Sequence, residues 1–174
     1  MHELRIGIAG FGVVGKRRNR CISTLPHVKV VAVSDKTFAN DHMAEEFVCL
    51  DDYRKLYNEK MDALFVCLTN DVASDAVIMG LENGLHVFCE KPPGRNLADV
   101  TSVLECKKKY PQLKLMYGFN HRYHSSVQEA LKIVRSGELG KILNLSGVYG
   151  KSKLITFNQS DWRTKKKLQA VVFY

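Results

Sequence analysis

The sequence predicts an α/β fold built on an open, doubly wound parallel sheet. Five short apolar runs alternate with stretches of helical length, and the first run leads into a glycine-rich turn. Near-continuous apolar runs are typical of strands buried on both faces, and their alternation with helices indicates right-handed crossovers. The expected strands are Leu4–Ala9, Val28–Ser34, Ala63–Leu68, His86–Cys89 and Leu113–Tyr117.

The stretches between these strands have the length and composition of helices. Asn96 is the expected N-cap of the last helix, and Asp99 in its first turn suits the positive end of the helix dipole. The expected helices are Val14–Thr24, Asn40–Val48, Asp71–Asn83 and Asn96–Tyr110.

The pattern changes after Tyr117. The apolar residues of Ser125–Ser136 have helical spacing, and Ile142–Tyr149 has the composition of a strand. We therefore expect one domain over residues 1–120, followed by an incomplete second α+β domain over residues 121–174. A strand without sheet partners recruits other chains, so we expect a homo-oligomer formed through this C-terminal strand.

Composition limits the class of protein. Of 174 residues, 45% are apolar and 25% are charged, which is ordinary globular usage and argues against a disordered chain. We expect no membrane segment, because no apolar run approaches the roughly 20 residues that a spanning helix needs. The N-terminus lacks the pattern of a secretory signal. The net charge of +8 is compatible with phosphate-bearing ligands.

The five cysteines are widely spaced and include no Cys-x-x-Cys pair. Such spacing predicts neither a zinc site nor a redox dithiol, and we expect no bound metal. Thiols inside apolar runs behave as small hydrophobic groups. We therefore expect reduced, structural cysteines in a cytoplasmic protein.

A basic cluster, residues 16–20, falls in the first expected helix. One interpretation is a nucleic-acid patch. Helical spacing, however, spreads these side chains around the axis, and no aromatic stacking platform accompanies them. We expect a solvated helix face and no nucleic-acid partner.

The glycine-rich turn fits the pattern G-x-G-x-x-G between a strand and a helix. Gly10 permits a tight turn, Gly12 lets the backbone approach a diphosphate, and Gly15 lets the helix pack closely. The helix N-terminus supplies unpaired N–H groups for the phosphates. The alternative is a glycine-rich turn without a ligand. The pattern predicts a Rossmann-type site whose cofactor contacts include Gly10, Phe11, Gly12, Val13 and Val14.

Asp35 ends the second expected strand, near the place where an acid accepts hydrogen bonds from the adenosine ribose. Its charge repels a 2′-phosphate, which favours NAD over NADP. Lys36 beside it, with Lys16 and Arg17 in the first helix, keeps NADP open.

Glu90-Lys91-Pro92-Pro93 follows the fourth expected strand directly. Ligands of open α/β sheets bind outside the carboxyl ends of the strands. A lysine there can donate to an oxygen at the reacting carbon, and desolvation would strengthen this role by lowering its pKa. A surface lysine in a proline turn is the alternative, and the residues alone leave both open.

Taken in order, these motifs resemble the Gfo/Idh/MocA family, which includes glucose–fructose oxidoreductase and inositol dehydrogenases. The resemblance covers about residues 4–163. Its elements are the glycine turn 10–15, Asp35, Thr69-Asn70, the stretch 84–92, the stretch 118–123, the turn 136–140 and Trp162-Arg163.

The resemblance implies NAD(P)-dependent hydride transfer at a carbon of a sugar, cyclitol or nucleotide-linked sugar. Lys91 matches the family's catalytic lysine, which also contacts substrate, and Glu90 lines the cofactor pocket. By the same matching, cofactor contacts are implied for Thr69, Asn70, Lys91, Asn120, Trp162 and Arg163, and substrate contacts for Asn120 and Arg122. Lys36 is a further expected cofactor contact because it lies beside Asp35.

The sequence departs from the family pattern at two places. Residues 68–73 lack the proline and the histidine of the usual Thr-Pro-Asn-x-x-His motif. The family also carries a second-domain histidine that works with the lysine, whereas the last histidine here is His124. We therefore expect a truncated form with impaired turnover. The alternative is a non-catalytic dinucleotide-binding module that pairs with itself or with another subunit.

Overall fold

The computed structural model describes residues 3–44 and 46–148. The described chain divides into two compact units, of which the first ends at Gly118 and the second begins at Phe119. Each unit is described by itself below. In the described residues, no helix is long and apolar enough to cross a lipid bilayer.

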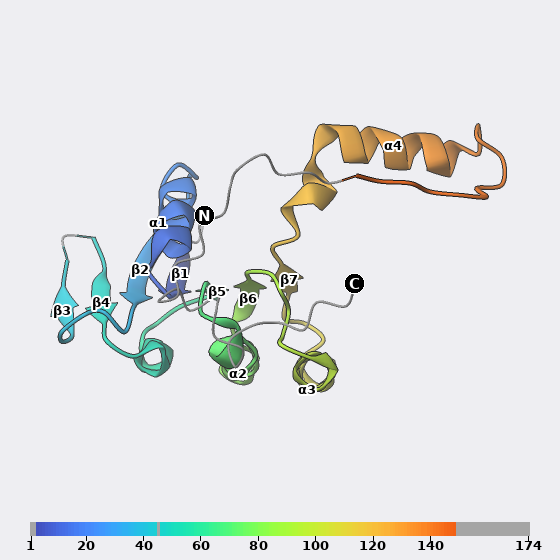
Figure 1. Ribbon diagram of the computed structural model, residues 1–174. Coiled ribbons are helices and arrows are strands. Elements are labelled where there is room, and N and C mark those ends of the chain that lie inside the picture. Colours follow the sequence, from blue (N-terminus) through green and yellow to red (C-terminus); the bar gives the residue numbers. More distant parts are fainter. Residues whose placement is uncertain (1–2, 45, 149–174) are drawn as a thin grey trace, which may run out of the picture. The chain divides into compact units, whose positions relative to one another are not determined.

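The described residues of the first unit form a seven-stranded sheet in the order β3-β4-β2-β1-β5-β6-β7 (Figure 1). All neighbouring strands are parallel except β3, which runs antiparallel to β4. This confirms the predicted doubly wound parallel sheet. The strands are β1 (Leu4–Ala9), β2 (Val28–Ser34), β3 (His42–Met43), β4 (Val48–Leu50), β5 (Ala63–Val66), β6 (His86–Cys89) and β7 (Leu115–Tyr117).

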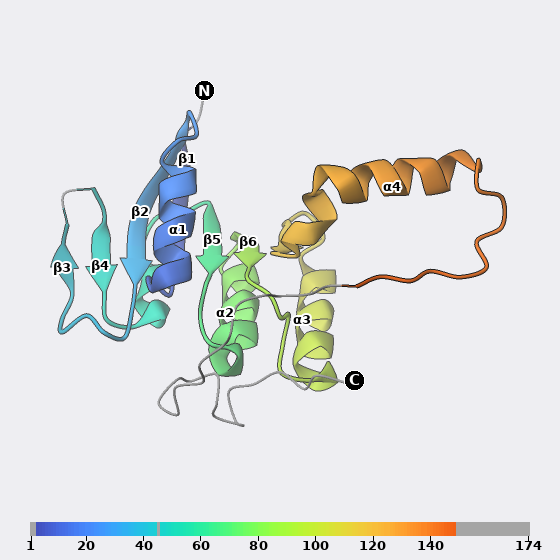
Figure 2. The same cartoon turned by 45° about the horizontal axis from the view of Figure 1, so that its top comes forward.

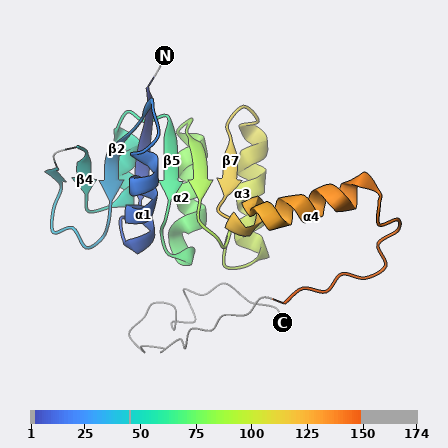
Figure 3. The same ribbon diagram turned by 90° about the horizontal axis from the view of Figure 1, so that it is seen from above.

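Helices cover both faces of the sheet (Figure 3). On one face, Ile22 of α1 packs with Ile6 and Ile8 of β1. On the other face, residues of α2 and α3 enclose Leu64 and Val87 in the larger core cluster. Burial on both faces explains why the strands read as continuous apolar runs. The helices of this unit are α1 (Val13–Ile22), the 3-10 helix η1 (Tyr53–Asn58), α2 (Asn70–Glu82) and α3 (Leu97–Lys109).

The start of α3 confirms the predicted cap. The side-chain oxygen of Asn96 accepts a hydrogen bond from the main-chain N–H of Asp99 at 3.0 Å, which satisfies one of the unpaired donors of the first turn. Asp99 also pairs with Arg95, Nε to Oδ2, at 2.9 Å.

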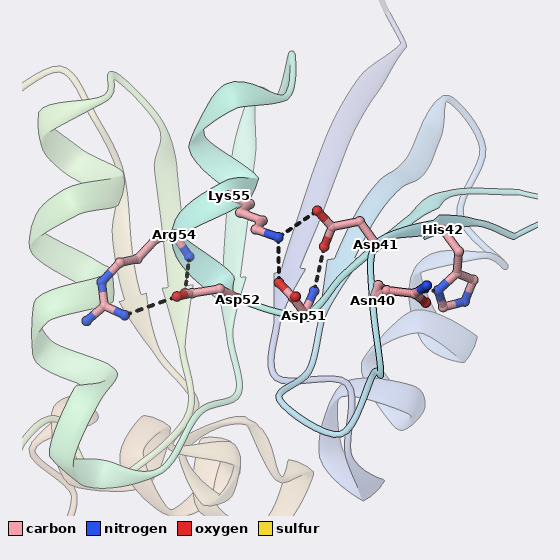
Figure 4. A network of polar contacts seen from close by, with 7 residues as sticks. All are labelled: Asn40, Asp41, His42, Asp51, Asp52, Arg54 and Lys55. Carbon is pink, nitrogen blue, oxygen red and sulfur yellow. Dashed lines mark hydrogen bonds and ion pairs between the residues drawn. The ribbon is translucent and has the colours of Figure 1, made fainter.

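The predicted helix over Asn40–Val48 is wrong. The described residues of this range include β3 and the first residue of β4, which pair antiparallel to each other. β4 also pairs with the edge of β2, with Ala32 opposite Val48. A cation fixes this arrangement: Lys55 Nζ lies 2.7 Å from Asp41 Oδ2 and 2.7 Å from Asp51 Oδ1 (Figure 4). The side chains of Asp41 and Lys55 thus connect the hairpin to η1, an element that the sequence analysis missed.

The second unit begins with the 3-10 helix η2 (Asn120–Tyr123) and continues as α4 (Ser125–Ser136), which confirms the predicted helix. Gly137, directly after α4, has a φ of 80°, the left-handed conformation that commonly terminates helices. The predicted strand Ile142–Tyr149 is wrong for residues 142–148, which form no strand, and Tyr149 lies outside the described residues. A strand forms only where its main chain finds a hydrogen-bonding partner.

Candidate functional site

The carboxyl ends of the parallel strands meet at one edge of the sheet, toward which the arrowheads of β2, β4, β5 and β6 point (Figure 2). β1 lies between β2 and β5, so the chain winds away from it in both directions. Ligand crevices of open α/β sheets form at such a switch point. Two hydrogen bonds tie the surrounding loops together: Gly10 N donates to Ser34 O at 2.9 Å, and Cys67 N donates to Ala9 O at 2.7 Å.

The three glycines of the turn have different surroundings. Gly10 has a φ of 91°, and a Cβ there would lie 2.6 Å from the Cys67 carbonyl oxygen. A Cβ on Gly15 would lie 2.0 Å from the Gly10 carbonyl oxygen, whereas a Cβ on Gly12 would meet no atom within 4 Å. Gly10 and Gly15 are therefore required by packing within the chain, and Gly12 leaves open space for a ligand.

The first turn of α1 has the features of an anion site. The helix begins at Val13, directly after Gly12, with no side-chain cap and no acidic residue in the first turn. Unpaired N–H groups and the positive end of the dipole remain available there. Phe11, half-buried, packs edge-on against Phe47 with ring centroids 5.4 Å apart, and Val14 is also half-buried. The residues present therefore fit a diphosphate.

Asp35 follows the carboxyl end of β2 and is half-buried. Its Oδ1 accepts hydrogen bonds from Thr37 N at 3.0 Å and from Thr37 Oγ1 at 2.8 Å. Its main-chain N–H donates to Leu50 O at 3.0 Å. Among the described residues, Oδ2 has no hydrogen-bonding partner, so this oxygen is free for a ligand hydroxyl. Lys36 is exposed beside it.

Thr69 and Asn70 lie at the start of α2, just beyond the carboxyl end of β5. Thr69 is the N-cap, and its carbonyl oxygen accepts from Val72 N at 3.2 Å and from Ala73 N at 3.1 Å. Both Thr69 and Asn70 are half-buried. They therefore border the same edge of the sheet as the glycine turn.

Glu90 continues the parallel pairing past the end of β6, because its N–H donates to Val66 O at 2.9 Å. Its carboxylate is bound by a residue of α1: Arg18 Nε donates to Glu90 Oε1 at 2.8 Å, and Arg18 Nη2 donates to the same oxygen. The guanidinium carbon lies 4.9 Å from the centre of the Phe88 ring. The side chain of Arg18 is only 22% exposed, and that of Glu90 is only 17% exposed.

The prediction that the whole basic cluster, residues 16–20, is a solvated face is wrong at Arg18. Lys16 and Arg17 are exposed as expected, but Arg18 is half-buried and paired. The signal was present in the sequence. Arg18 is three residues after Gly15 and four before Ile22, the two buried residues of α1, and this spacing places all three on one helix face.

Lys91 follows Glu90 and is exposed, and the Lys91–Pro92 peptide is cis. Within residues 3–44 and 46–148, no hydrogen bond or ion pair engages the Lys91 amine. Gly118 lies beside the Glu90 carboxylate, since a Cβ on Gly118 would be 3.1 Å from Glu90 Oε2. The amine is thus available to a ligand at this edge.

The thiols near Glu90 are chemically quiet. Burial, helped by the Glu90 charge and opposed by Arg18, raises the pKa of Cys67 to about 12. Burial likewise raises the pKa of Cys89 to about 12. All five cysteines are free. A thiol whose pKa is raised by burial, as at Cys67 and Cys89, is a poor nucleophile. No metal-binding group of three or more His, Cys, Asp or Glu residues occurs in the described part of the chain.

Four further predicted site residues lie in the second unit or outside the described residues. Asn120 and Arg122 belong to the second unit, where both are exposed; Arg122 N donates to Phe119 O at 3.1 Å. Trp162 and Arg163 lie outside the described residues. The structure therefore brings together the glycine turn, Asp35, Thr69-Asn70 and Glu90-Lys91, all from the first unit.

Residues 4–119 match the model of an oxidoreductase family described by its NAD-binding Rossmann fold, the Gfo/Idh/MocA family. The chain belongs to this family. Among Gfo/Idh/MocA relatives, an uncharacterized oxidoreductase, YrbE of Bacillus subtilis, is 33% identical over 145 residues. A myo-inositol 2-dehydrogenase of Thermotoga maritima is 30% identical over 145 residues. Each alignment covers 79% of this chain and 42% of the relative.

Solved Gfo/Idh/MocA structures have the same fold. Myo-inositol 2-dehydrogenase of Lactobacillus plantarum has a TM-score of 0.70 and 31% identity, covering 80% of this chain and 43% of that protein. Scyllo-inositol dehydrogenase of Lactobacillus casei was solved with bound NAD(H) and scyllo-inositol. It has a TM-score of 0.69 and 25% identity, covering 79% of this chain and 42% of that protein. The chain thus spans less than half the length of these relatives.

Proposed function

We propose that the first unit binds NAD(H) at the carboxyl edge of its sheet and contributes the cofactor half of an oxidoreductase. The substrate class is a sugar or cyclitol, oxidised or reduced at a hydroxyl-bearing carbon. The observation that carries the proposal is the open space at Gly12, beneath the uncapped N-terminus of α1. When bound, the nicotinamide supplies the hydride acceptor or donor. Membership of an NAD-binding family supports this choice of cofactor.

Asp35 supports NAD in preference to NADP. Its Oδ1 is held by Thr37, which fixes the carboxylate and leaves Oδ2 to accept from the adenosine ribose. A 2′-phosphate at that place would meet this negative charge. Lys36 is the nearest feature in sequence that would offset the repulsion, and NADP therefore remains the second cofactor to test.

Lys91 is our proposed catalytic residue. Its amine is exposed and unengaged in the described part of the chain, at the edge where the nicotinamide end of the cofactor would lie. In the oxidation direction the neutral amine would take the hydroxyl proton as the carbinol loses its hydride. In the reduction direction the ammonium would donate a proton to the oxygen as the carbonyl gains the hydride. Asn120 and Arg122 are proposed to contact substrate, and Trp162 and Arg163 to contact cofactor, on the resemblance alone.

A second candidate function is a non-catalytic dinucleotide-binding module that pairs with itself or another subunit. The observation that favours it is the exposed apolar surface of the second unit, where Leu143 and Leu145 are each 86% exposed and Val148 is 97% exposed. Exposed apolar patches mark association surfaces. We propose that the chain forms a homo-oligomer through residues 142–148, which contain these apolar side chains. The free thiols fit the cytoplasmic location that we also propose.

Cofactor binding is tested by titrating the full chain with NADH and with NADPH, following nicotinamide fluorescence. We expect NADH to bind more tightly, and Asp35→Ala to reduce the preference by about tenfold. Gly12→Val should abolish binding because its side chain fills the open space. Gly147→Val is the matched control, since Gly147 also faces open space. Equal binding by both glycine variants would contradict the proposal.

Catalysis is tested by single-turnover mixing of the NADH-loaded or NAD-loaded chain with a panel of inositols and sugars. Hydride transfer that disappears in Lys91→Ala, with NADH affinity retained, would support the oxidoreductase. Tight binding of NADH with no transfer across the panel would favour the non-catalytic module.

A further inference from the structure

The pair between Arg18 and Glu90 joins two segments that are 72 residues apart in the sequence. Two nitrogens of the guanidinium donate to Oε1 of the carboxylate, and the guanidinium rests on the ring of Phe88. Stacking on an aromatic face adds an attraction that holds the arginine in place. Because arginine stays charged at all physiological pH values, this counter-charge for Glu90 is permanent.

Burial makes the pairing necessary. The Glu90 side chain is 17% exposed, and a carboxylate so far removed from water needs a compensating charge. Without Arg18, the carboxylate would take another cation within reach. The chain itself holds one there: adjacent Cα atoms are about 3.8 Å apart, and the long flexible stem of Lys91 lets its ammonium reach back to the neighbouring carboxylate.

Several other described cations are held by carboxylates of their own. Arg5 pairs with Asp62, Arg54 with Asp52, and Arg95 with Asp99. Lys55 is bound by two aspartates. Lys91 is adjacent to Glu90 in the sequence, so we take it as the cation that replaces Arg18. It is also the residue whose amine must stay free if it is to serve the reaction.

We propose that Arg18 is a positioning residue, which keeps the Lys91 amine available by occupying the adjacent Glu90 carboxylate. Its consequence for hydride transfer rests on the proposed function, in which Lys91 handles the substrate proton. The contact itself does not depend on that function. It makes α1, the helix proposed to bind the diphosphate, also a support for the loop that carries the lysine.

The test measures how fast the Lys91 amine of the full chain is acetylated by N-acetoxysuccinimide at neutral pH, followed by mass spectrometry of the peptide. Arg18→Gln should slow the reaction by about fivefold, the factor that corresponds to an ion pair of about 1 kcal/mol. Removing the competing carboxylate as well, in Arg18→Gln with Glu90→Gln, should restore the wild-type rate. Arg17→Gln is the matched control, because Arg17 is an exposed neighbour on the same helix.

An unchanged rate in folded Arg18→Gln would overturn the proposal. So would a slowed rate that Glu90→Gln fails to restore, because Arg18 would then act through loop structure and not through the carboxylate. If circular dichroism shows that Arg18→Gln is unfolded, Arg18→Lys takes its place. The expected loss is then about twofold, because lysine keeps the charge but lacks the fork and the stacking, and Glu90→Gln must again restore the rate.

Acetylation requires neither cofactor nor turnover, so the outcome is separate from that of the proposed function. A chain that shows the acetylation pattern but no hydride transfer would retain the Arg18 inference and lose the oxidoreductase. A chain that shows hydride transfer but not the acetylation pattern would retain the oxidoreductase and lose the Arg18 inference.

Discussion

The two units use the same kind of sequence pattern with different results. In the first unit, apolar residues at strand and helix spacing are buried in two clusters on the two faces of the sheet. In the second, α4 has apolar residues at equally regular spacing, yet none of its residues is buried. Local periodicity thus specifies a helix in both units, whereas burial also requires a partner surface. The candidate site lies in the first unit, where strands and helices pack against one another.

The sharpest way to test this comparison is to disturb packing inside the first unit. Gly15→Ala places a methyl group 2.0 Å from a main-chain oxygen, and backbone cannot move aside as a flexible side chain can. We expect the free energy of unfolding in urea to fall by about 2–4 kcal/mol.

Gly12→Ala is the matched control because its methyl group meets no atom, so its loss should remain below about 1 kcal/mol. Equal losses in the two variants would show that Gly15 is not required by helix–strand packing.

How far the sequence predicts the molecule follows the same division. Strands β1, β2, β5, β6 and β7, helices α1 to α3 and the tight packing at Gly10 and Gly15 were accessible, because apolar periodicity and glycine spacing are local signals. The hairpin β3–β4 was not, since its pairing with β2 depends on register and on the contacts of Lys55. Nor was the partner of Arg18, because a contact across 72 residues has no local signature.

A second prediction concerns alkaline pH, to which the buried thiols of the first unit should be sensitive. The pKa of Cys67 is raised from 9.0 to about 12, chiefly by burial. Between these values the unfolded chain loses the proton and the folded chain keeps it, so stability falls as pH rises through this window. Below about pH 9 the thiol is protonated in both states and stability is unaffected.

Burial also raises the pKa of Cys49, Cys89 and Cys106, so Cys67 carries only part of this dependence. Cys67→Ala should therefore make the decline of unfolding free energy between pH 9 and 10.5 less steep by about a quarter, as measured by urea denaturation at each pH. Cys21→Ala, which removes an exposed thiol, is the control and should leave the slope unchanged. If the Cys67→Ala slope equals that of the wild type, the thiol does not govern this dependence.

The smallest expected effect lies in the second unit, where added charge should cost little folding stability but alter association. Leu143 and Leu145 are each 86% exposed, so replacing both with lysine removes no buried contact described here. If this segment associates, the double variant should shift sedimentation toward the monomer and weaken association by about tenfold. Asn144→Lys is the matched control, because it adds charge at a polar position between the two leucines. A wild-type chain that sediments as a monomer at high micromolar concentration would show that exposed apolar residues in this unit do not drive self-association. The two units would then differ in how far their apolar residues are buried, and not in self-association.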